Sequence, residues 1–412
     1  MQADAPSTYV RRHVDSRLDA LLDEAPAILL TGARGVGKTT TALRRVAEVA
    51  RLDVPATAIA WRSDPDAMLA SAATPLLIDE WQFVPEVLGA VKRSVDAASS
   101  PGRFIVAGSA GSDRAPTTWP GTGRLVRLQM RGLTQAEVSG TTATDLVARL
   151  TDPAAMASAV SDWSVVDYAR SALAGGFPAT AASSAEFRQA WLDSYIEQIA
   201  ARDIPSLGGG VSPAGLTRFL EAQAAVAPAV VTTESLRTAS GVSRNTADTY
   251  ERRLTDIGII TALPPWWSNR LKRLTKSPKR TLTDTGLLAA LLRVDLPAVL
   301  NDGLLLGRLF EAFVIAQIEP QVALSPRSRL HHVRTQEGRH EIDLLVEFPD
   351  GRLFGIEVKA TAAPTPSDAR HLDWLAAEVG DRWAGGAVLC AGPRSYRLTG
   401  DHWAVPASYL WR

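Results

Sequence analysis

The chain has 412 residues, which at roughly 150 residues per domain indicates two to three domains rather than a single core. The 44 Lys and Arg residues balance the 44 Asp and Glu residues, so any nucleic acid must bind a local basic patch rather than a uniformly charged surface. One cysteine excludes an internal disulfide framework, and no apolar run reaches the roughly 18 residues of a membrane span.

The N-terminal residues also lack the apolar core of a signal peptide, so we expect a soluble, cytoplasmic protein without a membrane partner. In the first third of the chain, short apolar runs alternate with longer amphipathic ones, which predicts a parallel α/β domain. Helical periodicity dominates the following segment, up to about residue 229. In the α/β domain the pattern predicts helices at residues 38–51 and 85–98, and strands at residues 27–31, 57–61, 76–79, 104–107 and 125–128.

A phosphate-binding loop follows the first predicted strand. The sequence Gly-Ala-Arg-Gly-Val-Gly-Lys-Thr fits G-x-x-x-x-G-K-[ST] and leads directly into a predicted helix. Backbone N–H groups of such a loop bind phosphates at a helix N-terminus. We expect Lys38 to reach the β- and γ-phosphates of ATP and Thr39 to bind Mg²⁺. The predicted ATP-binding residues are Gly32, Ala33, Arg34, Gly35, Val36, Gly37, Lys38, Thr39 and Thr40.

Polar residues end two further strands at the edge of the sheet where ligands bind. Asp79 is the residue type that completes the Mg²⁺ shell, and Glu80 is positioned to orient or deprotonate the attacking water. An alternative for Glu80 is a solvated acid that caps the strand. The next strand ends in Gly108 and Ser109, which places a hydroxyl at the same edge or simply forms a Gly-Ser turn.

These motifs occur in the order seen in a widespread bacterial and archaeal family, the AAA-type ATPases with a restriction-endonuclease-like C-terminal domain. The resemblance covers nearly the whole chain. It is carried by residues 31–40, 76–82 and 105–109, by Gly123-Arg124-Leu-Val-Arg127, and by residues 281–287, Thr-Leu-Thr-Asp-Thr-Gly-Leu.

The resemblance implies roles for residues beyond the loop. Ser109 takes the sensor position, and Arg124 is an arginine finger supplied in cis or by a neighbouring subunit of a homo-oligomer. The chain has Arg131-Gly132-Leu133 where a proline commonly precedes the leucine, so Arg127 competes with Arg124 for this role.

A helix, a glycine turn and a second helix capped by Ser243 follow the helical segment, and a basic stretch comes after them. The start of the second helix is where a helix-turn-helix contacts the major groove. The alternative is a winged-helix unit that links domains or packs on a partner protein. The predicted DNA-binding residues are Arg244, Asn245 and Thr246 at the helix start, and Arg270, Lys272, Arg273, Lys276, Lys279 and Arg280 in the basic stretch.

Two alternating segments flank a Pro-Asp-Gly turn in the C-terminal region, which predicts a β-hairpin. With a loop at residues 349–351, Asp343 lies opposite Glu357, and Glu341 lies opposite Lys359. Facing carboxylates repel each other unless a cation neutralises them, and Mg²⁺ or Mn²⁺ suits oxygen ligands.

Asp on one strand with Glu-x-Lys on the next is the active-site pattern of the restriction-endonuclease fold, and Glu311 matches the helical acid of that fold. The resemblance therefore implies a metal site of Glu311, Asp343 and Glu357, with Lys359 positioning the nucleophile. The alternative is a solvated hairpin face with a Glu341–Lys359 ion pair.

We thus predict a P-loop AAA-type ATPase domain at residues 1–140, a helical lid at 141–230, a winged helix-turn-helix at 231–299 and a restriction-endonuclease-like α/β domain at 300–412. The expected function is ATP binding and hydrolysis in a DNA-associated protein with a nuclease-like domain. The alternatives are a nucleotide-gated switch that binds DNA or protein and cuts nothing, and a DNA-translocating ring motor.

Overall fold

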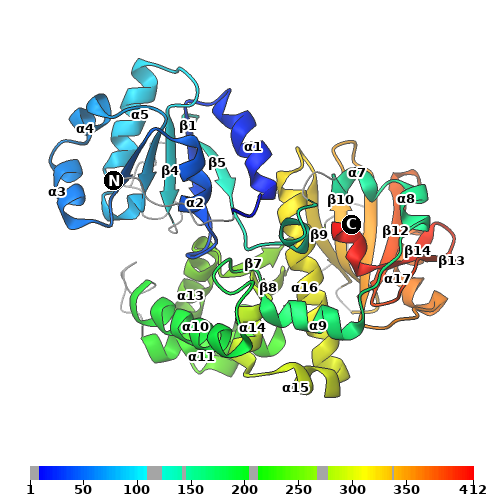
Figure 1. Cartoon of the computed structure of the whole chain (residues 1–412). Coiled ribbons are helices and arrows are strands. Elements are labelled where there is room, and N and C mark those ends of the chain that lie inside the picture. Colours follow the sequence, from blue (N-terminus) through cyan, green and yellow to red (C-terminus); the bar gives the residue numbers. More distant parts are fainter. Residues whose placement is uncertain (1–8, 109–122, 142–144, 204–211, 267–276, 336–337) are drawn as a thin grey trace. The chain divides into compact units, whose positions relative to one another are not determined.

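The structure is a computed structural model that describes residues 9–108, 123–141, 145–203, 212–266, 277–335 and 338–412 (Figure 1). The chain divides into two compact units. Unit 1 comprises Met1–Leu133, Phe177–Ala179 and Arg253–Ile259, and unit 2 comprises Thr134–Gly176, Thr180–Arg252 and Ile260–Arg412.

A five-stranded parallel sheet in the order β2-β3-β4-β1-β5 forms the centre of unit 1. One face packs against α3, α4 and α5 through a buried apolar cluster that includes Leu29, Trp61, Ile78 and Val106. The elements are α1 (His13–Leu22), β1 (Ala27–Thr31), α2 (Lys38–Ala42), β2 (Glu48–Arg51), α3 (Pro55–Ser63), α4 (Pro65–Ser71), β3 (Leu76–Asp79), α5 (Val87–Ala97), β4 (Phe104–Gly108) and β5 (Val126–Gln129).

The strands expected at residues 27–31, 76–79, 104–107 and 125–128 are confirmed to within one residue, but two other predictions for this unit are wrong. Residues 57–61 belong to helix α3, which begins with Pro55 and buries Ala58 and Trp61 while Ile59 is exposed. A proline in the first turn and apolar residues three apart favour a helix, whereas a short apolar run alone does not distinguish helix from strand. The helix expected over residues 38–51 stops early, and β2 forms the edge strand beside β3.

The N-terminal part of unit 2 is helical, as expected, and leads into a three-stranded antiparallel sheet in the order β6-β8-β7. Its helices are α6 (Gln135–Val138), α7 (Leu146–Arg149), α8 (Pro153–Ala157), α9 (Val165–Ala174), α10 (Ala185–Gln198), α11 (Pro213–Val226) and α12 (Thr233–Ser240). Next come α13 (Arg244–Asp256), α14 (Thr285–Leu292) and α15 (Leu296–Asn301), and the strands are β6 (Ala229–Val230), β7 (Ile260–Leu263) and β8 (Lys279–Leu282).

A six-stranded mixed sheet in the order β13-β14-β12-β11-β10-β9 follows the long apolar helix α16. Strands β9, β10 and β11 are antiparallel, whereas β12 runs parallel to both β11 and β14. The elements are α16 (Gly303–Leu324), β9 (Arg329–Arg334), β10 (Glu341–Glu347), β11 (Leu353–Lys359), α17 (Arg370–Val379), β12 (Trp383–Cys390), β13 (Tyr396–Thr399) and β14 (His402–Pro406).

The predicted hairpin is β10–β11, and its register is confirmed. Leu344 pairs with Ile356 and Val346 with Phe354, and the Phe348 N–H donates to the Arg352 carbonyl across the loop at 2.9 Å. The apolar side chains on one face of the hairpin, at alternating positions from Ile342 to Val358, are all buried. Strands β9 and β14 were not expected from the sequence pattern. Among the described residues, none of the helices combines the length and the apolar character that crossing a membrane requires.

Candidate functional site

The loop between β1 and α2 depends on its glycines. Gly32 has φ 147°, and a Cβ there would lie 2.1 Å from the Met130 carbonyl oxygen. Gly37 has φ 99°, a left-handed conformation, at the position where α2 begins. Glycine adopts such angles without the steric cost that a side chain would add. The loop is therefore pressed against the backbone that follows β5 and turns sharply into α2.

Lys38 is 6% exposed, and its ammonium group lies inside the loop. Nζ donates to the carbonyl oxygens of Gly32 and Ala33, both at 2.9 Å. Burial lowers the pKa of Lys38 to about 8, although Glu80 and Asp79 act in the opposite direction. The buried charge has neutral partners here, so a phosphate at this position would be a stronger partner than the loop carbonyls.

The two residues expected to hold Mg²⁺ lie side by side. The Thr39 hydroxyl donates to Asp79 at 3.1 Å from Oδ1 and 3.0 Å from Oδ2. Burial raises the pKa of Asp79, with the hydrogen bond from Thr39 opposing it. Strand β4 lies between β1 and β3 in the sheet, and the carboxyl ends of these parallel strands meet at one edge. This edge therefore gathers a hydroxyl, a carboxylate and the phosphate loop.

Glu80 follows β3 in a left-handed conformation with φ 55°. This conformation is uncommon for a residue with a side chain and is typical of functional sites. The Gln82 side-chain amide donates to the Glu80 carboxylate. A Cβ at Gly108 would lie 2.7 Å from the ring of the fully buried Trp81, so a side chain at the end of β4 would require Trp81 to move. Ser109, the expected sensor, lies outside the described residues.

The two candidate arginine fingers differ in their surroundings. The Arg124 guanidinium lies 2.9 Å from Asp96 of α5, and both side chains are substantially exposed. Arg127 lies on β5 beside β1, and its Nε donates to Thr31 Oγ1 at 3.4 Å. Thr31 directly precedes Gly32, so Arg127 is the arginine that lies against the strand leading into the phosphate loop.

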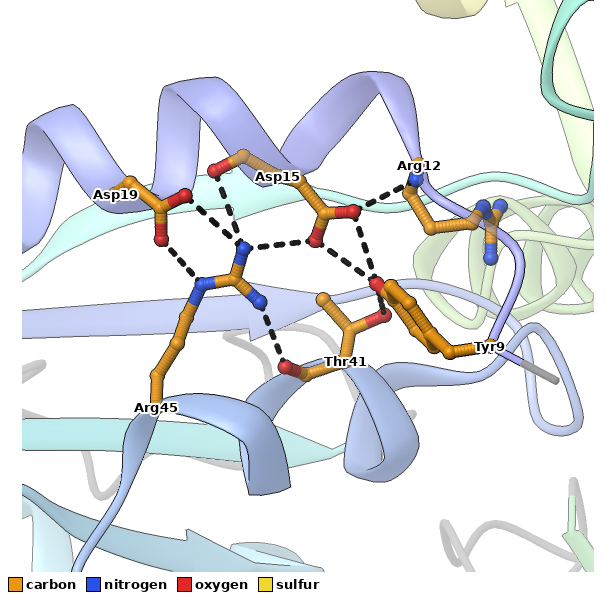
Figure 2. Close-up of polar contacts among 6 residues, drawn as sticks. All are labelled: Tyr9, Arg12, Asp15, Asp19, Thr41 and Arg45. Carbon is orange, nitrogen blue, oxygen red and sulfur yellow. Dashed lines mark hydrogen bonds and ion pairs between the residues drawn. The ribbon is translucent and has the colours of Figure 1, made fainter. Parts of the chain in front are cut away.

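A polar network at α1 supports the loop and was missed from the sequence (Figure 2). The Asp15 carboxylate accepts from Tyr9 Oη at 2.8 Å and from Arg45 Nη2 at 2.9 Å, and Tyr9 Oη lies 3.0 Å from Thr41 Oγ1 of α2. Arg12 Nη1 donates to the carbonyl of the loop residue Val36 at 2.8 Å. No motif marks these residues, because their partners are far apart in the chain.

The predicted glycine turn lies between α12 and α13, and α13 begins with a side-chain cap. Ser243 Oγ accepts from the Thr246 N–H at 3.2 Å, which caps the helix, and Arg244 and Asn245 are exposed. Gly241 has the left-handed conformation that ends α12. The predicted contacts Arg270, Lys272, Arg273 and Lys276 lie outside the described residues.

The prediction that Lys279 and Arg280 contact DNA is wrong. Their side chains are 2% and 7% exposed, because both lie on β8, the central strand of the three-stranded sheet. Arg280 Nε lies 2.6 Å from Glu251 Oε1 on α13, and Lys279 Nζ ion-pairs with Glu311 and Asp343. Both cations are used within the protein core, where nucleic acid has no access.

The three acids predicted as metal ligands, Glu311, Asp343 and Glu357, lie near Lys279 together with Glu341. We call these four acids, Glu311, Glu341, Asp343 and Glu357, the carboxylate cluster. Lys279 Nζ lies 2.6 Å from Glu311, 2.9 Å from Asp343 and 3.8 Å from Glu341. Lys359 Nζ lies 3.5 Å from Glu357, and on the other side of β10 the Cα partner of Glu341 is Arg334 of β9.

Burial and mutual repulsion shift the titration of the cluster. Burial, and then Asp343, raise the pKa of Glu311 to about 7, and the same causes raise that of Glu357 well above its ordinary value. Burial would raise the pKa of Asp343 as well, but Lys279 and Lys359 outweigh it and the pKa is lowered. No set of three or more His, Cys, Asp or Glu side chains within the described ranges is arranged to hold a metal ion.

The motif at residues 281–287 proves to be structural. Asp284 is buried and accepts from the backbone N–H of Gly176 at 2.6 Å and of Leu287 at 2.8 Å. It therefore caps α14 and joins it to the turn after α9. A Cβ at Gly175 would lie 2.5 Å from Asp284 Oδ1, so the Gly-Gly turn and the aspartate fit each other.

The parallel sheet, the phosphate loop and the Thr39–Asp79 pair define the class of AAA-type ATP-binding proteins, and a model of the AAA domain family matches residues 24–139. Two further models, described as domains of unknown function DUF8612 and DUF4143, match residues 165–298 and 306–410. The chain belongs to the family of two mycobacterial proteins, the uncharacterized protein Rv2008c of Mycobacterium tuberculosis and the uncharacterized protein Mb2031c of Mycobacterium bovis. Each is 32% identical over 405 residues, which cover 97% of this chain and 84% of the relative.

Among solved structures, the Walker-type ATPase PABY2304 of Pyrococcus abyssi is similar with a TM-score of 0.44 and 13% identity. The match covers 70% of this chain and 97% of that one.

Proposed function

We propose that the protein binds ATP with Mg²⁺ and hydrolyses it at the edge of the parallel sheet in unit 1. The observation that carries the proposal is the convergence of Lys38, the Thr39–Asp79 pair and Glu80 at the ends of β1 and β3. Thr39 and Asp79 are the residues that would hold Mg²⁺, which would neutralise phosphate charge. Backbone N–H groups from Gly32 to Thr40 would bind the phosphates.

Glu80 would orient the attacking water and accept its proton, and the bond to Gln82 holds its carboxylate in place. Ser109 keeps its proposed sensor role. For the arginine that stabilises the transition state, Arg127 is the candidate within the same chain, because it already contacts Thr31. Arg124 is exposed and remains the candidate for action on a neighbouring subunit.

Steady-state ATP hydrolysis tests this proposal. Lys38→Ala removes the charge at the phosphates and should lower turnover at least about 100-fold. Glu80→Gln should lower kcat by about 10²- to 10⁴-fold while ATP still binds, because only proton transfer is lost. Lys92→Ala is the matched control, since Lys92 forms a surface ion pair with Asp96 on α5. Unchanged turnover in the first two variants would show the proposal to be wrong.

A second proposed activity is DNA association as a nucleotide-gated switch. The proposal is supported by the element order α11, β6, α12, α13, β7, β8, which is that of a winged helix. The three strands form one antiparallel sheet, and Arg244 and Asn245 are exposed at the start of α13. The order α16, β9, β10, β11, α17, β12 likewise supports a restriction-endonuclease-like fold for the last 110 residues or so. We do not propose cutting, because Lys279 lies among the acids that would bind the metal.

Fluorescence-anisotropy titrations of duplex DNA at several salt concentrations test DNA association. The double variant Arg244→Ala/Asn245→Ala should weaken binding and reduce the slope of log K against log salt by about one, since one cation is lost. Arg237→Ala is the control, because Arg237 is paired with Glu234 on α12. The triple variant at Lys272, Arg273 and Lys276 should lower affinity further. Equal affinity in all these proteins would contradict the assignment.

A further inference from the structure

Lys279 is the most deeply buried cation of the carboxylate cluster. Its side chain is 2% exposed, whereas the side chain of Lys359 is 39% exposed. Lys279 Nζ lies within hydrogen-bond distance of both Glu311 and Asp343, the two acids on which a metal site would depend. The three donors of an ammonium group thus have two carboxylate partners, with Glu341 further away at 3.8 Å.

The acids of the cluster have cationic partners without a divalent ion. Lys279 pairs with Glu311 and Asp343, and Lys359 pairs with Glu357. Glu341 lies 3.8 Å from Lys279 Nζ and 3.6 Å from Arg334 Nη1, so every acid of the cluster already has a cation beside it. A divalent cation added to this set would carry excess positive charge into a buried site.

The backbone fixes Lys279 at this position from two sides. Strand β8 pairs with both β6 and β7, which aligns Lys279 with Val230 and Leu263. Just before Lys279, the Ser277 carbonyl lies 3.0 Å from His332 Nε2 of β9, and burial lowers the pKa of His332 to about 4. His332 is therefore neutral at pH 7 and adds no charge beside the ammonium group. Within the carboxylate cluster, the buried oxygen Glu357 Oε1 has no hydrogen-bond partner among the described residues.

We propose that Lys279 Nζ is the resident cation of the carboxylate cluster and takes the place of the divalent metal that the fold would otherwise hold there. In this role the acids anchor β8 to α16 and to the hairpin β10–β11. They do not activate water. A corollary is that the metal site is latent: removal of the Lys279 side chain leaves Glu311, Asp343 and Glu357 with an uncompensated negative charge that a divalent cation can bind.

Titration of the full chain with Mn²⁺ tests the proposal. The protein is first freed of metal with EDTA, the EDTA is removed, and no nucleotide is added. Electron paramagnetic resonance then measures the free Mn²⁺, from which the bound Mn²⁺ is obtained. Every protein carries Asp79→Asn, so that the proposed ATP site adds no metal. With Lys279 present, we expect no Mn²⁺ binding that depends on Asp343. Lys279→Ala should gain one bound Mn²⁺, and Lys279→Ala/Asp343→Asn should lose it again. Lys359→Ala is the matched lysine control and should gain none, because Lys279 remains.

Thermal unfolding keeps the proposal testable if Lys279→Ala does not fold. In the Lys279-containing protein, Glu311→Gln should lower Tm equally in EDTA and in Mn²⁺, because it weakens an ion pair and not a metal site. The parent protein is the chain that carries Asp79→Asn and keeps Lys279. The proposal is overturned if EDTA lowers the Tm of this parent protein and Mn²⁺ restores it. It is also overturned if the parent protein binds Mn²⁺ and Asp343→Asn abolishes that binding. Metal-dependent plasmid cutting by the wild type that disappears in Asp343→Ala would overturn it as well. None of these outcomes bears on ATP hydrolysis.

Discussion

Two buried lysines show how the partner of a charge sets its behaviour. Lys38 and Lys279 are both almost fully buried, but Lys38 donates to neutral carbonyls while Lys279 lies against carboxylates. Burial lowers the pKa of Lys38 to about 8. For Lys279 burial acts in the same direction, but attraction to Asp343, Glu311 and Glu341 outweighs it and the pKa is raised. Lys38 therefore lacks an anionic partner that a phosphate would supply, whereas Lys279 already has carboxylate partners.

This difference predicts that ATP binding takes up protons in alkaline solution. Above about pH 8 the ammonium group of Lys38 is partly neutral in the free protein, and phosphates favour its charged form, so binding should raise the Lys38 pKa. ATP affinity should therefore fall as pH rises from about 8 to about 10.5, with uptake of up to one proton per ATP. Calorimetric titrations at about pH 9 in two buffers of different ionisation enthalpy measure this uptake.

Lys38→Arg is the control for proton uptake, because a guanidinium stays charged throughout this range. Its binding heat should not depend on the buffer. Equal proton uptake by both proteins would assign the titration to another group.

At the level of elements, Asp284 joins two helices that are about 110 residues apart in the chain. It caps α14 through the Leu287 N–H and holds the Gly176 N–H of the turn after α9. Burial raises the pKa of this carboxyl group, and the backbone N–H groups oppose the shift. In the sequence, residues 281–287 stood out only through their resemblance to a family motif. The structure shows that Asp284 of this segment packs two helices together.

We expect Asp284→Ala to cost about 2 to 4 kcal/mol of unfolding free energy, because a cap and a buried backbone partner are lost together. Asp295→Ala is the matched comparison. Asp295 caps α15 through the Ala298 N–H at 2.9 Å but is exposed, so its loss should cost only about 1 kcal/mol. Urea unfolding monitored by circular dichroism compares the two. Similar costs would show that the contact with Gly176 contributes little.

At the scale of the whole molecule, the net charge is neutral, but some of the opposite charges are paired across long stretches of chain. Residues 231–285 carry ten basic and five acidic residues, an excess that favours a DNA-binding patch when counted along the chain. The fold removes Lys279 and Arg280 from that patch by pairing them with Glu311, Asp343 and Glu251. The charge available to a partner is therefore smaller than the sequence count indicates.

Local patterns in the sequence were enough for the phosphate loop, four of the five strands of the parallel sheet and the register of the β10–β11 hairpin. Each of these depends on neighbouring residues: glycine spacing, apolar runs, or alternation about a short turn. The strand predicted at residues 57–61 is wrong, because apolar content alone does not distinguish a helix from a strand. The edge strand of the sheet is instead β2, which the sequence pattern did not predict.

Contacts between distant segments could not be inferred in this way. Three contacts join residues that no local pattern connects. They are Arg12 with the phosphate loop, Asp284 with Gly176, and Lys279 with the acids of the carboxylate cluster. A basic stretch looks the same in sequence whether its lysines face solvent or a buried carboxylate. Whether the hairpin acids hold a metal or a lysine therefore depends on where β8 lies beside them, since burial and pairing of a charge depend on the folded surroundings.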